Sequence, residues 1–200
     1  LGMCALLWLS VLPDRVAAAD TYSAEAVEAA FLYRFIGYVN WPPQPAPDAP
    51  FTIAVLDDDA VARELQLLIG KRPVQNRVAQ VRTIRNIKDL DGAQMLYIGV
   101  AHNDDLRRLI APLAGRPVLI VTNAPDGLEA GGSVNFLLID HRVRFEISLD
   151  ASQSAGLRIS SELLAVAIRV RGRRVFLEPG CESAISEAAS APCIREAASW

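Results

Sequence analysis

The sequence predicts an α/β fold: a Rossmann-like, mostly parallel sheet flanked by helices, with a C-terminal antiparallel hairpin at its edge. Short apolar runs alternate along the chain with amphipathic helical patterns, which is typical of βαβ units and a largely parallel sheet. Two further apolar runs, residues 133–139 and 143–149, are separated by a polar connection of hairpin length, Asp140 to Arg142. The 200 residues, of which 52% are hydrophobic, suffice for one substantial core.

The first element is expected to be a helix over 24–40, with Ser23 placed to cap it and Glu28 near its positive end. Its second half is apolar on every side, so we expect it to lie between layers or against another chain. A proline-rich connection up to Pro50 follows. The next elements are a strand over 51–56, a helix over 60–69, one or two short strands within 74–84, a strand over 95–100, a helix over 103–113 and a strand over 117–122.

The second strand of the predicted hairpin alternates strictly between apolar and polar residues. One face carries Val143, Phe145, Ile147 and Leu149, and the other carries Arg142, Arg144, Glu146 and Ser148. We expect the apolar face to cover a core and the polar face to meet solvent or a partner. After Gly156, apolar residues recur at helical spacing behind Ser160 and Ser161, which predicts a helix that begins at these hydroxyls.

Both ends of the chain differ from this body in composition. Residues 1–19 hold an apolar run and three alanines before Asp20, the pattern of a signal peptide that is cleaved there and directs export to the periplasm. A short buried helix is the alternative, and the missing positive start indicates a truncated or misassigned beginning. Residues 20–171 are expected to form a single domain, and residues 172–200, rich in Ala, Ser and Glu, a flexible tail.

The net charge argues against one class of function, and the positions of the cysteines limit where a disulfide can form. The net charge is -3 and the pI is about 5.4, and the basic residues are scattered, which argues against nucleic-acid binding. Beyond the predicted signal peptide the cysteines are Cys181 and Cys193, both in the predicted tail. In an oxidising compartment they can pair as a disulfide that closes a small loop, and reduced or intermolecular thiols are the alternative.

No catalytic or metal-binding constellation is evident, so we expect neither enzyme activity nor a cofactor. His102 and His141 are the histidines, each in a predicted loop or turn without a cysteine or carboxylate cluster. The run Asp57–Asp59 looks like the acidic, Mg²⁺-binding start of a response-regulator receiver domain. The next strand, however, ends in residues 99–101, Gly-Val-Ala, where a phosphoacceptor aspartate belongs, so capping of the following helix is the preferred interpretation.

Two segments at opposite ends of the domain resemble one known family. Residues 31–42, FLYRFIGYVNWP, and residues 142–164, RVRFEISLDASQSAGLRISSELL, are similar to the YfiR-like family of small periplasmic proteins, and the resemblance extends over about residues 25–170. It implies an α/β regulator, commonly a homodimer, that binds and inhibits an inner-membrane diguanylate cyclase and so controls cyclic di-GMP signalling and biofilm formation. It also implies an outer-membrane OmpA-like lipoprotein as a second partner.

The family's redox behaviour is not expected here. Some YfiR-like proteins carry disulfides within the domain that tune their function, whereas this chain has no cysteine between Asp20 and Gly180. The resemblance therefore does not carry a redox switch over to the domain of this chain.

Two functions remain after these exclusions. One is the regulator that binds a cyclase, and the other is a periplasmic sensor without a cyclase partner, whose small-molecule ligand lies at the carboxyl ends of the parallel strands, near Asp57, Val100 or Thr122. For the regulator we expect partner contacts at Phe35, Tyr38, Trp41, Arg144, Glu146 and Arg158. The alternatives are that the three aromatic residues fill the core and that the three charged residues form ion pairs with neighbours.

Overall fold

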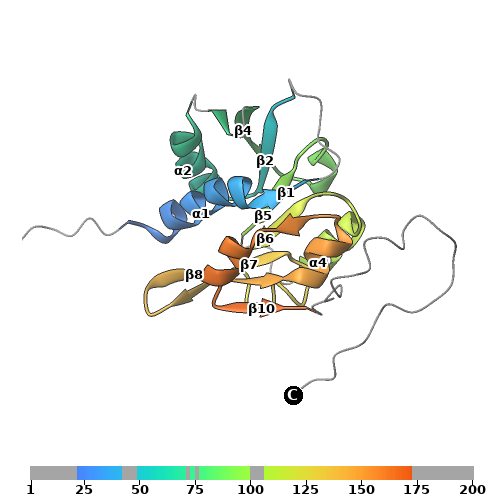
Figure 1. Ribbon diagram of the computed structural model, residues 1–200. Helices are drawn as coiled ribbons and strands as arrows, with labels where there is room; N and C mark the ends of the chain where they lie inside the picture. The colour runs from blue at the N-terminus through green and yellow to red at the C-terminus, as the bar shows by residue number, and fades with distance from the viewer. Residues whose placement is uncertain (1–21, 42–48, 71–72, 75–76, 100–105, 173–200) are drawn as a thin grey trace, which may run out of the picture.

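The computed structural model describes residues 22–41, 49–70, 73–74, 77–99 and 106–172. The predicted signal peptide, the predicted tail beyond Gly172 and both of its cysteines lie outside these residues, as does Val100. Within the described chain the predicted α/β class and mostly parallel sheet are confirmed (Figure 1).

One sheet of eight strands forms the centre of the domain. Its strands are β2 (Phe51–Leu56), β3 (Pro73–Val74), β4 (Arg77–Ile84), β5 (Met95–Ile98), β6 (Leu119–Thr122), β7 (Val134–Ile139), β8 (Arg142–Ser148) and β10 (Arg169–Arg171). Their spatial order is β3-β4-β2-β5-β6-β7-β8-β10, and the pairings from β4 to β7 are all parallel. Because β4 returns to the far side of β2, the chain reverses direction across the sheet between β2 and β5.

Helices cover both faces of this sheet, and strand alternation gives each face its own core. On one face, α1 (Ala24–Tyr38), α2 (Asp59–Ile69) and α5 (Ser161–Val166) pack over side chains such as Ile53 and Val55. On the other face, α3 (Leu106–Ile110) and the 3-10 helices η1 (Ile87–Asp89) and η3 (Ala111–Leu113) pack over the intervening side chains, such as Ala54 and Leu56. This two-sided burial is why every residue of β2 is buried and all of them except Thr52 are apolar.

The helices begin where side-chain acceptors satisfy free backbone amides. Ser23 Oγ accepts a hydrogen bond from the first turn of α1 at 3.2 Å, and Asp58 Oδ1 accepts one from the first turn of α2 at 3.0 Å. Ser160 Oγ accepts from the first turn of α5 at 3.4 Å. The predicted caps at Ser23 and Ser160 are therefore confirmed.

Several predicted boundaries are corrected. The first helix ends at Tyr38, because the next two residues are extended as β1 (Val39–Asn40) and pair antiparallel with β9 (Arg158–Ile159). In the described part of the helix predicted over 103–113, α3 gives way to η3, which contains Pro112, a residue without an N–H to donate. Residues 149–154 form a short helix, α4, capped by Ser148, where the end of a strand was predicted.

The predicted antiparallel hairpin is present as β7 and β8. Its turn consists of Asp140 and His141, with φ of 49° and 58°, which is the backbone of a tight two-residue hairpin connection. The structure adds β10 on the outer side of β8, parallel to it, so the hairpin lies one strand in from the edge of the sheet. The helix predicted to begin at Ser160 and Ser161 is short, because α5 ends at Val166 and the chain returns to the sheet as β10.

Candidate functional site

The carboxyl ends of the parallel strands meet at one edge of the sheet, where the chain reverses between β2 and β5. Open α/β sheets favour ligand sites at such a point. Asp57 and Asp58 follow β2 directly, Gly99 follows β5, Asn123 follows β6 and Arg85 follows β4. This is the edge at which the sequence predicted a small-molecule site.

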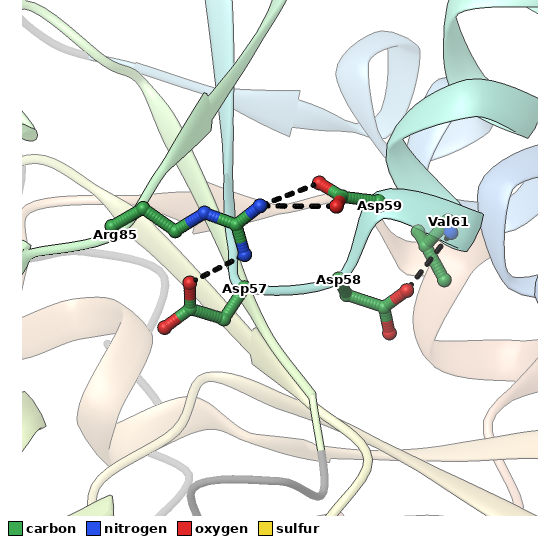
Figure 2. Close-up of polar contacts among 5 residues, drawn as sticks. All are labelled: Asp57, Asp58, Asp59, Val61 and Arg85. Carbon is green, nitrogen blue, oxygen red and sulfur yellow. Dashed lines mark hydrogen bonds and ion pairs between the residues drawn. The ribbon is translucent and has the colours of Figure 1, made fainter.

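The three aspartates at this edge already have partners within the chain: Asp57 and Asp59 pair with Arg85, and Asp58 caps α2. Figure 2 shows the guanidinium of Arg85 between two carboxylates, 2.8 Å from Asp57 Oδ1 and 3.0 Å from Asp59 Oδ2. Asp58 points the other way and accepts a hydrogen bond from the Val61 amide, as predicted for a helix cap. No group of three His, Cys, Asp or Glu residues that could hold a metal ion occurs among the described residues.

A buried polar network lies behind this edge and joins α1 to the sheet. The Tyr97 hydroxyl donates to Glu28 Oε2 at 2.6 Å, and Asn123 Nδ2 donates to the Tyr97 oxygen at 2.8 Å. Burial raises the pKa of Glu28, which is 7% exposed, while the hydrogen bonds from Tyr97 and Asn123 oppose that rise. Burial and the neighbouring carboxylate raise the pKa of Tyr97. The Glu28 carboxyl group is therefore buried inside the domain, where Tyr97 and Asn123 donate hydrogen bonds to it.

Sequence patterns did not predict this network. Glu28 and Tyr97 are 69 residues apart, and from the sequence Glu28 is only a charge near a helix start. The sequence held one indication of a buried carboxylate: Glu28 stands next to Ala29 on the helix face that buries Leu32 and Phe35. A carboxylate on a buried helix face needs a hydrogen-bond partner, but the helical periodicity does not show which residue that partner is.

A second polar row crosses the sheet and corrects the prediction for Glu146. Thr122 Oγ1 donates to Asn135 Oδ1 at 2.7 Å, Asn135 Nδ2 donates to Glu146 Oε1 at 3.2 Å, and Arg169 Nη1 lies 3.2 Å from Glu146 Oε2. Glu146 is only 3% exposed, because β10 extends the sheet beside it; it is not on an open face. The ion-pair alternative is the correct one for this residue.

The same row shows that a ligand cannot reach Thr122. Its side chain is fully buried, and Gly127 packs so closely over it that an added Cβ would overlap the Thr122 hydroxyl. The prediction of a ligand beside Thr122 is therefore wrong for this conformation.

Two of the three predicted aromatic contact residues fill the core. Phe35 is fully buried, with its ring 5.9 Å from that of Phe136 and 5.3 Å from that of Phe145. Trp41 is 4% exposed, and its Nε1–H donates to the Gln94 carbonyl at 3.0 Å. The prediction that these two residues meet a partner is wrong for the described chain, because both already pack against its own elements.

Three predicted contact residues lie at the surface: Tyr38, Arg144 and Arg158. Tyr38 is 39% exposed and, together with Arg158, borders a groove of about 480 Å³ over β1 and β9. Tyr38 also borders a cavity of about 340 Å³ between α1, β8 and α5, whose other lining residues are Phe31, Arg34, Phe35, Phe145, Glu162, Leu163 and Val166. Arg144 is exposed on β8.

Comparison with one solved structure, a protein from Vibrio cholerae, supports the fold. A conserved domain protein from Vibrio cholerae O1 biovar El Tor superposes with a TM-score of 0.51 at 13% identity, over 74% of this chain and 60% of that one. The ABC domain from Streptococcus pneumoniae, solved in complex with L-Trp, superposes with a TM-score of 0.46 at 11% identity, over 60% of this chain and 55% of that one. The chain thus spans about three fifths of the Vibrio structure.

Comparison with family models identifies the chain more specifically. The model described as YfiR/HmsC-like matches residues 25–168, from the start of α1 to the residue before β10. The match covers well over half of the sequence and contains both segments that carried the resemblance. The chain belongs to the YfiR/HmsC-like family.

Proposed function

We propose that this protein is an exported periplasmic regulator that binds and inhibits an inner-membrane diguanylate cyclase and thereby controls cyclic di-GMP signalling. The observation that carries the proposal is the family match over residues 25–168, because the family consists of periplasmic regulators that act with membrane diguanylate cyclases. A homodimer and an OmpA-like lipoprotein partner are parts of the same proposal and rest on the family resemblance.

The described chain fits a binding role. Its polar clusters are engaged internally: Arg85 lies between two carboxylates, and Tyr97 donates to Glu28. No described helix is long and apolar enough to cross a membrane. A protein that binds the inactive state of a cyclase more tightly than the active state shifts the cyclase population toward inactivity.

Deletion of the gene tests this function in the host. We expect cyclic di-GMP, measured by mass spectrometry of cell extracts, to rise on deletion and to return to the parental level when the gene is restored on a plasmid. An unchanged level in the deletion strain would overturn the proposal, and a restored gene without the export segment serves as the control for periplasmic action.

A small-molecule sensor is the second candidate, and the cavity bordered by Tyr38 favours it. Its volume of about 340 Å³ and its largely aromatic and apolar lining are typical of a ligand pocket. A metabolite that binds there raises the melting temperature of the purified chain. Val166→Trp, which fills the cavity mouth, would abolish that rise; a broad apolar metabolite screen without any shift would reject this candidate.

A further inference from the structure

The turn end of the β7–β8 hairpin is exposed on one face and carries two arginines there. Val143 packs against the core on the α1 side, so strand alternation places its neighbours Arg142 and Arg144 on the opposite face. Their cross-strand partners are Ile139 and Leu137, which lie on that same face. We call these four residues the hairpin face.

The two arginines of the hairpin face have no carboxylate partner in the described part of the chain. The next strand outward differs, because Arg169 pairs with Glu146 and Arg171 pairs with Glu129. Asp140 stands in the hairpin turn, yet it forms no ion pair with Arg142 or with Arg144. Two like charges on neighbouring positions of a strand repel each other, so they do not serve the stability of the isolated fold.

Apolar surface accompanies these charges. Ile139 is 43% exposed, and Leu137 is half-buried. The groove of about 540 Å³ that Tyr22 and Leu138 line is not part of this face, because Leu138 pairs with Val143 and lies on the α1 side of the hairpin. Arginine is enriched in protein interfaces, whose buried centre is more apolar than the rest of the surface.

We propose that the hairpin face is the docking surface for an acidic region on the periplasmic domain of the cyclase, an inference that rests on the proposed function. The chain is acidic overall, with a net charge of -3, so a surface with unpaired arginines selects a partner of opposite charge. Alternate residues on a strand are about 7 Å apart, so a matching pair of partner carboxylates has that spacing. Each guanidinium can then hold one carboxylate through two hydrogen bonds.

Charge reversal with a matched control tests this surface. The binding of the full chain to the purified periplasmic domains of the host's diguanylate cyclases is measured by calorimetry for R142E/R144E, for the milder R142Q/R144Q, and for R63E/R116E, which has the same charge change as the first variant on exposed positions elsewhere. We expect R142E/R144E to weaken binding at least about tenfold, R142Q/R144Q to weaken it less, and the control to stay within about twofold. Added salt weakens the unaltered complex more than it weakens R142Q/R144Q.

The possible results distinguish failure of the docking surface from failure of the proposed function. If R142E/R144E binds as tightly as the control while gene deletion still raises cyclic di-GMP, the hairpin face is overturned and the proposed function stands. If no cyclase domain binds the unaltered chain and deletion leaves cyclic di-GMP unchanged, the proposed function and the docking surface are both overturned. Melting temperatures within about 2 °C of the unaltered chain show that the variants are folded.

Discussion

Replacing Tyr97 with phenylalanine removes one oxygen atom from the buried network between α1 and the sheet. The hydroxyl donates to Glu28 Oε2 at 2.6 Å and accepts from Asn123 Nδ2 at 2.8 Å, so the variant deprives two buried groups of a partner at once. The ring itself is fully buried and keeps its packing, which isolates the effect of the hydrogen bonds.

The expected loss follows from these two hydrogen bonds. A hydrogen bond to a charged group contributes about 1.5–3 kcal/mol, and one between neutral groups contributes about 1 kcal/mol. Because the two bonds share one oxygen and the network can relax, we expect Tyr97→Phe to lower the free energy of unfolding by about 2–3 kcal/mol near neutral pH. For a domain of this size that corresponds to a fall of about 5–10 °C in melting temperature.

The loss of stability in Tyr97→Phe depends on pH, and the contacts of Glu28 determine whether it grows or shrinks as the pH rises. The Tyr97 hydrogen bond lowers the pKa of Glu28, which burial raises above its ordinary value of 4.5, so the variant pushes that pKa higher still. Between the ordinary and the raised pKa the folded chain holds more protons than the unfolded chain, and stability falls as the pH rises. In Tyr97→Phe this fall extends to higher pH, so the loss grows from pH 4 to pH 8.

Urea unfolding at several pH values measures this effect, with Tyr38→Phe as the matched control. Tyr38 lies at the end of α1 and is 39% exposed, so removing its hydroxyl is expected to change stability by less than about 0.5 kcal/mol. The reasoning is refuted if the two variants lose the same stability, or if the loss in Tyr97→Phe is the same at pH 4 and pH 8.

Three further substitutions, one of them with a matched control at Tyr38, test the core, the outer strand and the loop packing. Phe35→Ala is expected to cost about 3–5 kcal/mol and Tyr38→Ala less than about 1 kcal/mol in urea unfolding, because only the first opens a cavity; equal losses would contradict the assignment of Phe35 to the core. Arg169→Ala is expected to cost about 1–3 kcal/mol, because it leaves the buried Glu146 carboxylate without its ion-pair partner; unchanged protection of β8 amides in hydrogen exchange would contradict this. Gly127→Ala is expected to cost about 1–3 kcal/mol, since the added methyl overlaps a buried threonine hydroxyl, and an unchanged melting temperature would argue against this packing.

Local sequence patterns predicted most of the helices and strands of the fold. The alternation of β8 predicted the hairpin, and the hydroxyls of Ser23 and Ser160 predicted the helix starts, because each depends on residues within a few positions of one another. The three-residue strand β10 could not be predicted in this way, since Arg169 to Arg171 looks like solvated chain until its pairing with β8 is known.

The errors at the candidate site have the same origin. The alternation in β8 placed Glu146 on a polar face correctly, yet the pattern does not show that Arg169 pairs with it and that β10 lies beside it. The all-apolar end of α1 left two uses open for Phe35, and only the packing of β7 and β8 against it decides between them. Burial by distant segments is a tertiary property that neither periodicity nor composition contains.

Reconstitution of the regulator with its cyclase tests most directly whether this protein inhibits a diguanylate cyclase. A host diguanylate cyclase with a periplasmic domain is incorporated into lipid nanodiscs, the purified full chain is added in increasing amounts, and cyclic di-GMP production is followed. We expect production to fall and level off as the regulator saturates the cyclase, and we expect R142E/R144E to require a higher concentration for the same fall. A rate of production that stays constant at every concentration of the regulator, for every such cyclase of the host, would contradict the account.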